Sequence, residues 1–438
     1  MTAQAVVWTV LALGVLAAPF AVLLAGELPA GRGFWWDFSM GLGYGALAMF
    51  ALQFALTARF RRMTHPFGID ALYLFHRVMA LGALALALGH FAILYVGYQD
   101  DLGVLNPLES DWELTAGRLA MVCFLLLVVT SEFRRRLRLE YGLWRYLHAG
   151  LAAVGFVAAI AHVLGVGSYT ASAGKTALWL GVTAGFLGLL VWVRLVKPWR
   201  QLRQPWRVVE NRSEQGGVYT LVLEPVGHRG LGAWQPGQFA WLTLGTSPFL
   251  LREHPFTMAN APESGPEIAF SIKPQGDFTA AAKGTAVGTT AYVDGPYGVF
   301  SIDRHPEATG FVMVAGGIGI TPLLANLRAL AARGDPRPAI LLFGNPTWED
   351  VPFRDELDRL AAASNLTVVH VLQEPPPDWQ GERGLIDGEL LARHLGDEHR
   401  DRPHFLCGPM PMIDALERAL DDRGVKLRRI QHEIFELV

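Results

Sequence analysis

The stretch "LYLFHRVMALGALALALGHFAILY" (residues 72–95) places two histidines, His76 and His90, in a run that is otherwise almost entirely apolar. A later stretch, "WRYLHAGLAAVGFVAAIAHVLG" (residues 144–165), repeats the pattern with two further histidines, which are again fourteen residues apart. Fourteen residues of α-helix advance about 21 Å and turn to within roughly 40° of the starting direction. Each stretch therefore predicts a helix that carries two histidines on one face, at two levels.

The composition indicates a membrane domain followed by a soluble part. Of 438 residues, 51% are hydrophobic and 18% are charged, which is too apolar for one ordinary soluble domain. Six runs before residue 196 are almost free of formal charge: 5–25, 38–58, 78–98, 114–131, 146–170 and 176–193. At ~1.5 Å per residue a long run can cross a ~30 Å hydrocarbon layer, and the shorter fourth run suffices if Arg118 lies near one end. We expect six membrane-spanning helices.

Loop charge predicts the orientation of these spans. Thirteen Lys or Arg residues lie in three alternate segments, "RFRR" (59–62), "EFRRRLRLEYGLWR" (132–145) and "RLVKPWRQLRQPWR" (194–207). The other loops hold only Arg32 and Lys175, and "QDDLGVLNPLESDWE" carries acidic residues alone. Because basic loops stay in the cytoplasm, both termini are expected there. No basic region or A-x-A-like site accompanies the first run, so we expect a retained span and not a cleaved signal peptide.

Two helices that run in the same direction bring their histidines face to face. His76 and His148 are expected near the cytoplasmic end, and His90 and His162 near the outer end. Six-coordinate haem iron needs one imidazole nitrogen on each side, and helix bundles supply such ligands from facing helices. The sequence therefore predicts that these four histidines ligate the iron of two b-type haems.

Intramembrane histidines can also have roles other than haem ligation. A single such residue is often a satisfied core group or part of a proton relay, but two pairs with matched spacing favour haem. A two-metal centre is excluded because the histidines of one helix are about 21 Å apart. Arg77 and Arg118 are candidates to meet haem propionates, or simply extend to the membrane interface. With only Cys123 and Cys407 present, neither a disulfide nor a cysteine-rich metal site is expected.

The second half of the chain reads as two soluble domains. Short segments such as "WQPGQFAWLTLG" and "EIAFSIKPQGDF", divided by Gly and Pro, predict a small antiparallel β-barrel. After residue 308 apolar strands alternate with helices, which predicts an α/β domain with a parallel sheet. There "GGIGIT" is by itself a weak phosphate-binding signal, although its glycines precede a helix expected to start near Thr321. The predicted domains are 1–199, 200–307 and 308–438.

The order of the motifs makes a resemblance specific. Behind the two histidine pairs stand "PGQF" (236–239), "HPFT" (254–257), "GDFT" (276–279), "GPYG" (295–298), "GGIGITP" (316–322) and "CGP" (407–409). Over nearly its full length the chain resembles the NADPH oxidase and ferric reductase superfamily. This resemblance implies a six-span haem domain joined to a ferredoxin-reductase-like flavin and pyridine-nucleotide module, in a bacterial-type inner (plasma) membrane.

The resemblance also implies roles for individual residues. Phe256 would flank the isoalloxazine ring, Thr257 would bind it near the reactive nitrogen, and Phe435 would stack on the face that nicotinamide must reach. Thr257, Cys407 and Phe435 would be the catalytic residues. The expected cofactor-binding residues are His254, Pro255, Phe256, Thr257, Lys273 and Thr279 for FAD, with Gly316, Gly317, Gly319, Thr321, Cys407, Gly408, Pro409 and Phe435 for the nucleotide and the flavin face. Purely structural alternatives are a barrel-core aromatic for Phe256, a buried strand end for Cys407 and a hydrophobic plug for Phe435.

The expected function is a transmembrane electron relay. Electrons would pass from cytosolic NADPH or NADH through FAD and two haems to an outer acceptor, with O2 giving superoxide favoured and a ferric chelate as the alternative. A haem-bearing transporter, channel or redox sensor is the non-enzymatic alternative, against which the flavin and nucleotide motifs argue. Pro346, at the position where a basic residue often meets the 2′-phosphate, puts a preference for NADPH in doubt. Membrane lipid is expected as a partner, but neither nucleic acid nor an obligatory activator subunit is.

Overall fold

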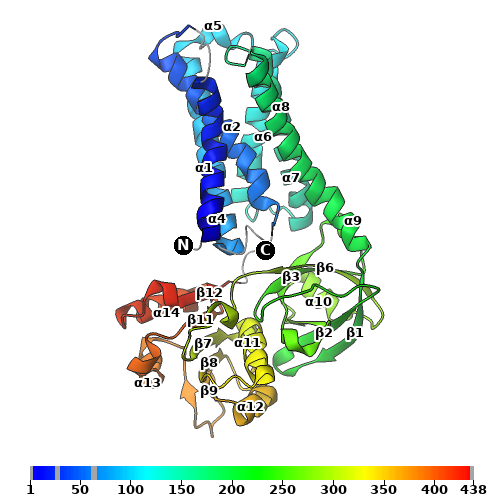
Figure 1. Ribbon diagram of the computed structural model, residues 1–438, viewed down its shortest axis with the longest axis vertical. Helices are drawn as coiled ribbons and strands as arrows, with labels where there is room; N and C mark the ends of the chain where they lie inside the picture. The colour runs from blue at the N-terminus through cyan, green and yellow to red at the C-terminus, as the bar shows by residue number, and fades with distance from the viewer. Residues whose placement is uncertain (1–2, 25–29, 61–66, 171, 435–438) are drawn as a thin grey trace. The chain divides into compact units, whose positions relative to one another are not determined.

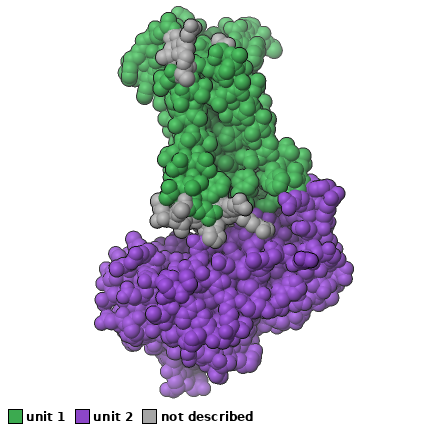
Figure 2. All heavy atoms as spheres, in the orientation of Figure 1, with its two compact units in different colours: residues 1–198 green, residues 199–438 purple. Residues whose placement is uncertain are grey.

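The computed structural model describes residues 3–24, 30–60, 67–170 and 172–434. The chain divides into two compact units, residues 1–198 and 199–438, which Figure 2 shows in different colours. The three-domain division by residue number stays a prediction.

The first unit is a helix bundle (Figure 1). Six helices in the described residues are long and apolar enough to cross a membrane, which confirms the prediction of six spans. They are α1 (Ala3–Leu24), α2 (Phe34–Thr57), α4 (Ile69–Gly97), α6 (Trp112–Glu132), α7 (Tyr141–Val166) and α8 (Ala173–Val191). The short α5 (Gln99–Leu102) follows α4, and α8 continues through a π-helical turn (Trp192–Val196) into α9 (Lys197–Leu202).

Two helix pairs form the most closely packed parts of the bundle, α2 with α4 and α6 with α7. Glycines allow the close approach, as is common where membrane helices meet. A methyl group built on Gly82 of α4 would lie 2.9 Å from the Cε atom of Met49 on α2. One built on Gly155 of α7 would lie 2.9 Å from the Cβ atom of Cys123 on α6.

A layer of buried apolar side chains joins these four helices at their middle. Ala83, midway between His76 and His90, is fully buried in it. Phe50 and Phe124 stack there with ring centroids 3.7 Å apart. The buried members of this central apolar layer are Ala46, Phe50, Ala83, Leu84, Ala120, Phe124 and Ala158. The layer therefore separates the two histidine levels with hydrocarbon.

The second unit begins with an antiparallel six-stranded sheet, as predicted. Its strands are β1 (Trp206–Ser213), β2 (Tyr219–Pro225), β3 (Phe239–Leu244), β4 (His254–Thr257), β5 (Ile268–Ile272) and β6 (Thr290–Tyr297), in the order β4-β3-β6-β1-β2-β5. A bridge between Met258 and Phe270 links the two edge strands and closes the sheet into a barrel. The helix α10 (Asp277–Ala282) lies between β5 and β6 in the chain.

The rest of the unit is the predicted α/β domain with a parallel sheet. Its strands are β7 (Phe311–Gly316), β8 (Ala339–Asn345), β9 (Leu366–Leu372), β10 (Glu382–Arg383), β11 (His404–Cys407) and β12 (Ile430–Glu433), in the order β10-β9-β8-β7-β11-β12. Its helices are α11 (Ile320–Arg333), α12 (Arg354–Ala363), α13 (Gly388–His394) and α14 (Met410–Asp422). Separate apolar clusters bury α11 and α12 against one face of the sheet and α13 and α14 against the other (Figure 1).

Buried hydrogen bonds hold the barrel and the α/β domain together. The side-chain oxygen of Asn326, which is fully buried on α11, accepts from the backbone nitrogen of Ile302 at 3.0 Å. Arg328 donates to the carbonyl of Ala259, just beyond β4, at 2.6 Å and forms a bidentate ion pair with Glu356. These contacts fix the end of β4 relative to the helix that follows the glycine turn.

Candidate functional site

The first histidine pair consists of His76 on α4 and His148 on α7. Their ring centroids are 6.2 Å apart, with the ring planes inclined by 51°. Imidazole–metal bonds are about 2.0–2.1 Å long, so two rings on opposite sides of one metal ion have centroids roughly 6–6.5 Å apart. The observed separation is therefore compatible with one metal ion between the two rings.

The second histidine pair, His90 on α4 and His162 on α7, is held by backbone carbonyls. The Nδ1 atom of His90 lies 2.9 Å from the carbonyl oxygen of Ser39 on α2. The Nδ1 atom of His162 lies 2.9 Å from the carbonyl oxygen of Glu113 on α6. A carbonyl only accepts hydrogen bonds, so each Nδ1 must carry the hydrogen. The Nε2 lone pair of each ring is thereby left free for a metal.

His148 is fixed in the same tautomer by a different group. Its Nδ1 atom lies 3.2 Å from the hydroxyl oxygen of Ser131 on α6, and that hydroxyl donates to the carbonyl of Leu127 at 2.7 Å. Because the hydroxyl hydrogen is already used, Ser131 accepts from His148. In His76 the Nδ1 atom is buried and has no partner among the described residues.

Two glycines also restrain the second pair. A methyl group built on Gly43 of α2 would lie 3.3 Å from His90 Nδ1, and one on Gly117 of α6 would lie 2.9 Å from His162 Nδ1. Sequence reasoning missed these glycines and the Nδ1 acceptors. The sequence does contain a signal for these glycines. Gly43 lies four residues after Ser39, and Gly117 lies four residues after Glu113, the residues whose carbonyls accept from the two histidines.

Both arginines that were candidates for haem propionates have partners in the protein. Arg77 forms a bidentate ion pair with Glu132, with N–O distances of 2.9 and 2.7 Å. Arg118 donates to the carbonyl of Val104 at 2.8 Å and to the hydroxyl of Ser110 at 3.2 Å. Arg118 thus ties the loop between α5 and α6 to α6, the helix whose Glu113 carbonyl accepts from His162.

The strand β4 presents the flavin-binding motif "HPFT" at the edge of the barrel sheet. The ring of His254 stacks on Phe278 of α10 with centroids 3.8 Å apart and planes 16° apart. Phe256 lies on the same side, 6.1 Å from Phe278 and inclined by 18°, while Pro255 pairs with Trp241 of β3. Parallel aromatic planes of this kind suit a flat ring system. Sequence reasoning missed Phe278, although it is the third residue of the "GDFT" motif.

Thr257 is the strongest indication that β4 binds a polar ligand. Its residue is 4% exposed, and its hydroxyl oxygen has no hydrogen-bond partner among the described residues. A buried hydroxyl without a partner is unfavourable, so a ligand that bonds to it would stabilise the site. This geometry fits the expectation that Thr257 bonds the isoalloxazine.

The two residues expected at the FAD pyrophosphate lie at the end of β5 and in α10. Lys273 follows the last residue of β5 directly and is partly exposed. The hydroxyl of Thr279 accepts from the backbone nitrogens of Gln275 and Gly276, both at 2.9 Å. The Thr279 hydroxyl therefore holds the turn before α10, a structural role that the sequence alone did not reveal.

The predicted nucleotide turn is assembled at the carboxyl edge of the parallel sheet. Gly316 ends β7, and a methyl group built on it would lie 2.9 Å from Pro409. A methyl group on Gly319 would collide with the backbone carbonyl of Cys407, and one on Gly408 would lie 3.1 Å from the nitrogen of Gly316. The turn and the "CGP" segment are thus in direct contact.

Two further turn residues complete this arrangement. Gly317 has φ = 54°, a left-handed conformation that favours glycine, and the space beside it is open. Thr321 is 2% exposed, and its hydroxyl donates to the carbonyl of Ile318 at 3.1 Å. Thr321 therefore closes the turn, while the open side at Gly317 leaves room for a phosphate at the start of α11.

A short chain of contacts connects the flavin and nucleotide motifs. Thr257 pairs with Phe239 of β3, and a methyl group on Gly298 would lie 3.1 Å from Phe239 and 3.7 Å from the carboxylate of Glu433. Glu433 in turn is in register with Cys407 on the neighbouring strand and is 9% exposed. Sequence reasoning missed this buried carboxylate. Phe435, expected on the flavin face, lies outside the described residues.

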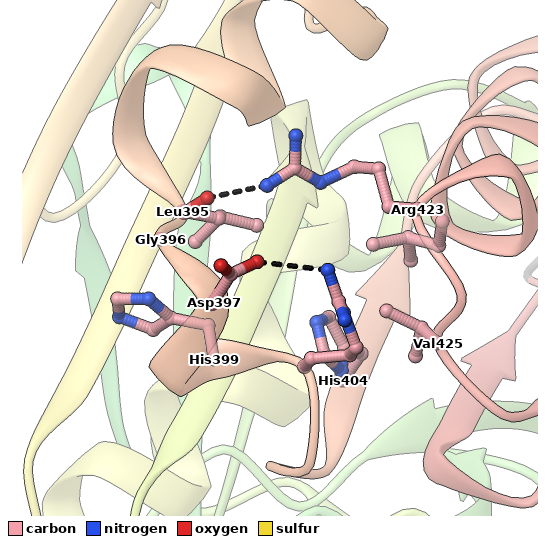
Figure 3. A pocket seen from close by; sticks show the side chains of 9 residues that line it. Leu395, Gly396, Asp397, His399, His404, Arg423 and Val425 are labelled. Carbon is pink, nitrogen blue, oxygen red and sulfur yellow. Dashed lines mark hydrogen bonds and ion pairs between the residues drawn. The ribbon is translucent and has the colours of Figure 1, made fainter.

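A small cavity at the opposite edge of the sheet is not a ligand site (Figure 3). It lies beside His404, the first residue of β11, and its volume of about 10 Å³ holds one water molecule. Arg400 pairs there with Asp397 at 2.8 Å, and Arg423 donates to the carbonyl of Leu395 (Figure 3). Burial lowers the pKa of His404 to about 4, so its imidazole is neutral at pH 7.

The loop after β8 is where the 2′-phosphate of NADPH was expected to bind. Pro346 follows the last residue of β8 and offers no charge. Arg354, the nearest cation that follows in the chain, donates to the carbonyl of Trp348 at 3.0 Å. Its guanidinium also lies 5.3 Å from the centroid of the Trp348 ring.

Comparison with known proteins identifies the domains. Residues 42–160 match the ferric reductase like transmembrane component, residues 228–301 an FAD-binding domain, and residues 313–418 an oxidoreductase NAD-binding domain. NADH-cytochrome b5 reductase 1 of Pyricularia oryzae is 35% identical over 171 residues, which are 37% of this chain and 54% of that protein. The protein of the same name from Candida albicans is 32% identical over 152 residues, which are 34% of this chain and 51% of that protein.

A solved structure resembles the second half of the chain. The cytochrome b5 reductase domain of Ulva prolifera nitrate reductase is 23% identical, covers 53% of this chain and 98% of its own, and has a TM-score of 0.46. The chain spans about half the length of the curated relatives that it matches. The three domains decide the class of protein. With matches to a ferric-reductase transmembrane component, an FAD-binding domain and an NAD-binding domain, and with six helices long and apolar enough to cross a membrane in its described residues, the chain is an integral membrane protein with the architecture of the NADPH oxidase and ferric reductase superfamily.

Proposed function

We propose that the protein carries electrons from cytosolic NADH or NADPH across the membrane to O2, which becomes superoxide. Two histidine pairs would each bind one b-type haem, and the second unit would bind FAD and the nicotinamide nucleotide. Both chain termini would lie in the cytoplasm of a bacterial-type cell. Per turnover, one NADH and two O2 give one NAD⁺, one proton and two superoxide ions.

The observation that supports this proposal most directly is the set of hydrogen bonds that orients the histidines as iron ligands. Three of the four Nδ1 atoms meet an acceptor on a neighbouring helix, which leaves Nε2 of each ring free. Such outer hydrogen bonds orient a histidine and raise its basicity as a ligand. The described residues contain no cluster of three or more His, Cys, Asp or Glu side chains suited to a metal ion.

Residues of the second unit would align the two reacting rings. When bound, FAD takes a hydride from the nicotinamide and the haems take single electrons, so the cofactors supply the redox chemistry. Phe256 and Thr257 would hold the isoalloxazine by stacking and by the hydroxyl that lacks a partner. Gly316 and Gly317 would admit the nucleotide pyrophosphate, which the amino end of α11 stabilises. Cys407 would border the nicotinamide.

Charge near the second histidine pair supports O2 over an anionic ferric chelate. The segment between α4 and α6 exposes Asp100, Glu109 and Asp111, and the same end of the bundle holds His90 and His162. Negative charge there repels an anionic chelate but not O2. If two histidines ligate each iron, they would leave no position for the acceptor, which would then be reduced without binding the metal.

The test uses the purified full chain with FAD and either nucleotide. We expect reduction of cytochrome c that superoxide dismutase suppresses, and the His162→Ala variant should lose it while its flavin is still reduced by NADH. Ferric-chelate reduction that persists under nitrogen, without a superoxide signal in air, would favour the ferric reductase alternative. Full activity in His162→Ala would refute the proposed electron path.

A further inference from the structure

Among the described residues of α2 and α4, two buried polar atoms of complementary character have no hydrogen-bond partner. One is Nδ1 of His76 on α4, and the other is the side-chain oxygen of Gln53 on α2. The amide nitrogen of Gln53 donates to the carbonyl of Met49 at 2.9 Å, so only the oxygen is left over. A buried polar atom without a partner is unfavourable and calls for a physical explanation.

The packing of α2 against α4 places these two atoms at one level. A methyl group built on Gly89 of α4 would lie 3.2 Å from Leu42 of α2, and one on Gly82 would lie 2.9 Å from Met49. Seven residues forward on α2 thus correspond to seven residues backward on α4, as in any antiparallel pair. Seven more residues along each helix bring the turn of α2 that contains Gln53 to the level of His76 on α4.

The second histidine pair shows the role of the corresponding position on α2. Ser39 supplies the carbonyl that accepts from His90 Nδ1. Gln53 follows Ser39 by fourteen residues on α2, and His76 precedes His90 by fourteen on α4. Because the helices are antiparallel, Gln53 has the same position relative to His76 as Ser39 has relative to His90.

We propose that Gln53 is the positioning residue of the first pair: its side-chain oxygen accepts a hydrogen bond from Nδ1–H of His76 when this histidine ligates iron. This inference rests on the proposed function. This hydrogen bond would pair the two leftover atoms and fix His76 in the tautomer that the other three histidines already have. The opposite ligand, His148, has its own acceptor in Ser131.

The hydrogen bond has a direct effect on the iron. An imidazole whose Nδ1–H is bonded is a more basic ligand and stabilises ferric over ferrous iron, which lowers the reduction potential. The residue of α6 that corresponds to Gln53 is Leu127. Its position relative to His148 is the same as that of Gln53 relative to His76. Gln53→Leu therefore gives α2 a side chain that the bundle already accommodates at the matching place.

The experiment is a potentiometric titration of the two haems in the purified full chain. In Gln53→Leu, one haem should become easier to reduce, with a change of the order of tenfold in its ferrous-to-ferric ratio, or about 59 mV for one electron. The other haem should keep its potential. Gln53→Glu, which restores an acceptor and makes it stronger, should shift the same haem the opposite way.

Two variants make the result decisive. Ser131→Ala removes the observed acceptor of His148 and should raise the potential of the same haem, which identifies it. Thr57→Val tests the hydroxyl one turn beyond Gln53, which donates to the Gln53 carbonyl at 3.0 Å. An unchanged potential in Gln53→Leu beside a shift in Ser131→Ala, or a shift in Thr57→Val alone, would overturn the inference. A wild-type protein that holds no haem would instead refute the proposed function.

Discussion

The glycine beside His162 offers a sharp test of how tightly the second histidine pair is built. We consider Gly117→Ala, a change of one methyl group on α6. That methyl would lie 2.9, 3.0 and 3.1 Å from the Nδ1, Cγ and Cε1 atoms of His162. Carbon atoms at van der Waals contact are about 3.5–4.0 Å apart, so the ring must retreat by roughly half an ångström.

A displacement of this size is large for a metal ligand. Distances at metal sites are kept within about ±0.2 Å, and the ring cannot retreat without stretching its 2.9 Å hydrogen bond to the Glu113 carbonyl. Disturbing such a partner typically lowers metal affinity by about 10- to 100-fold, equivalent to roughly 1.4–2.8 kcal/mol. Alanine is a better helix former than glycine by about 1 kcal/mol, so the helix itself should not unfold.

The matched control is Gly43→Ala, at the corresponding place beside His90. Its methyl would lie 3.3, 3.4 and 3.5 Å from the His90 ring, which requires a shift of only a few tenths of an ångström. We expect Gly117→Ala to lose about half of its haem by pyridine haemochrome assay, relative to bound FAD, and Gly43→Ala to keep nearly all of it. Equal haem contents in the two variants would refute the steric reasoning.

Three further outcomes follow from the described sites. Either His90→Ala or His162→Ala should halve the haem content and leave reduction of the flavin by NADH intact, and two retained haems would contradict the pairing. Pro346 follows β8 and carries no charge, and Arg354 is bonded to the Trp348 carbonyl. The kcat/KM values for NADPH and NADH should therefore differ by less than about 150-fold, which is the upper value for one charge-assisted phosphate contact. A ratio of several hundred would require another cation. Burial lowers the pKa of His404 to about 4, so the unfolded chain takes up a proton below about pH 6.5 that the folded chain refuses. His404 should therefore contribute a loss of about 2 kcal/mol to the stability of the second unit between pH 7 and pH 5, measured by thermal unfolding, and His404→Leu should reduce the pH dependence by this amount.

The sequence predicted those parts of the membrane site that depend on spacing within one helix. His76, His90, His148 and His162 were identified because a fourteen-residue interval has a fixed meaning in an α-helix. The groups that hold these histidines could not be identified in this way, because Ser39 and Glu113 lie on other helices about fifty residues away in the chain. Which helices pack together depends on tertiary contacts that no interval within one helix reveals.

In the second unit, motifs predicted position better than role. "GGIGIT" lies at a strand-to-helix turn, as expected, and "HPFT" forms the edge strand β4. The hydroxyl of Thr279, however, closes the turn before α10, because two backbone nitrogens of that turn need an acceptor. Glu433 stayed unnoticed because its place beside Cys407 arises from strands that are parallel neighbours but distant in sequence.

The central apolar layer has a consequence for membrane voltage. Its buried members between the two histidine levels are alanine, leucine and phenylalanine, so these side chains provide no hydrogen-bonding groups that could pass a proton. If electrons take the proposed route, negative charge leaves the cytoplasm while the proton released from NADH stays behind. Each turnover then depolarises the cell, and once the interior has become positive, moving one electron outward against 100 mV requires about 2.3 kcal/mol. Sustained superoxide production would therefore slow itself unless a separate ion pathway in the same membrane discharges the voltage.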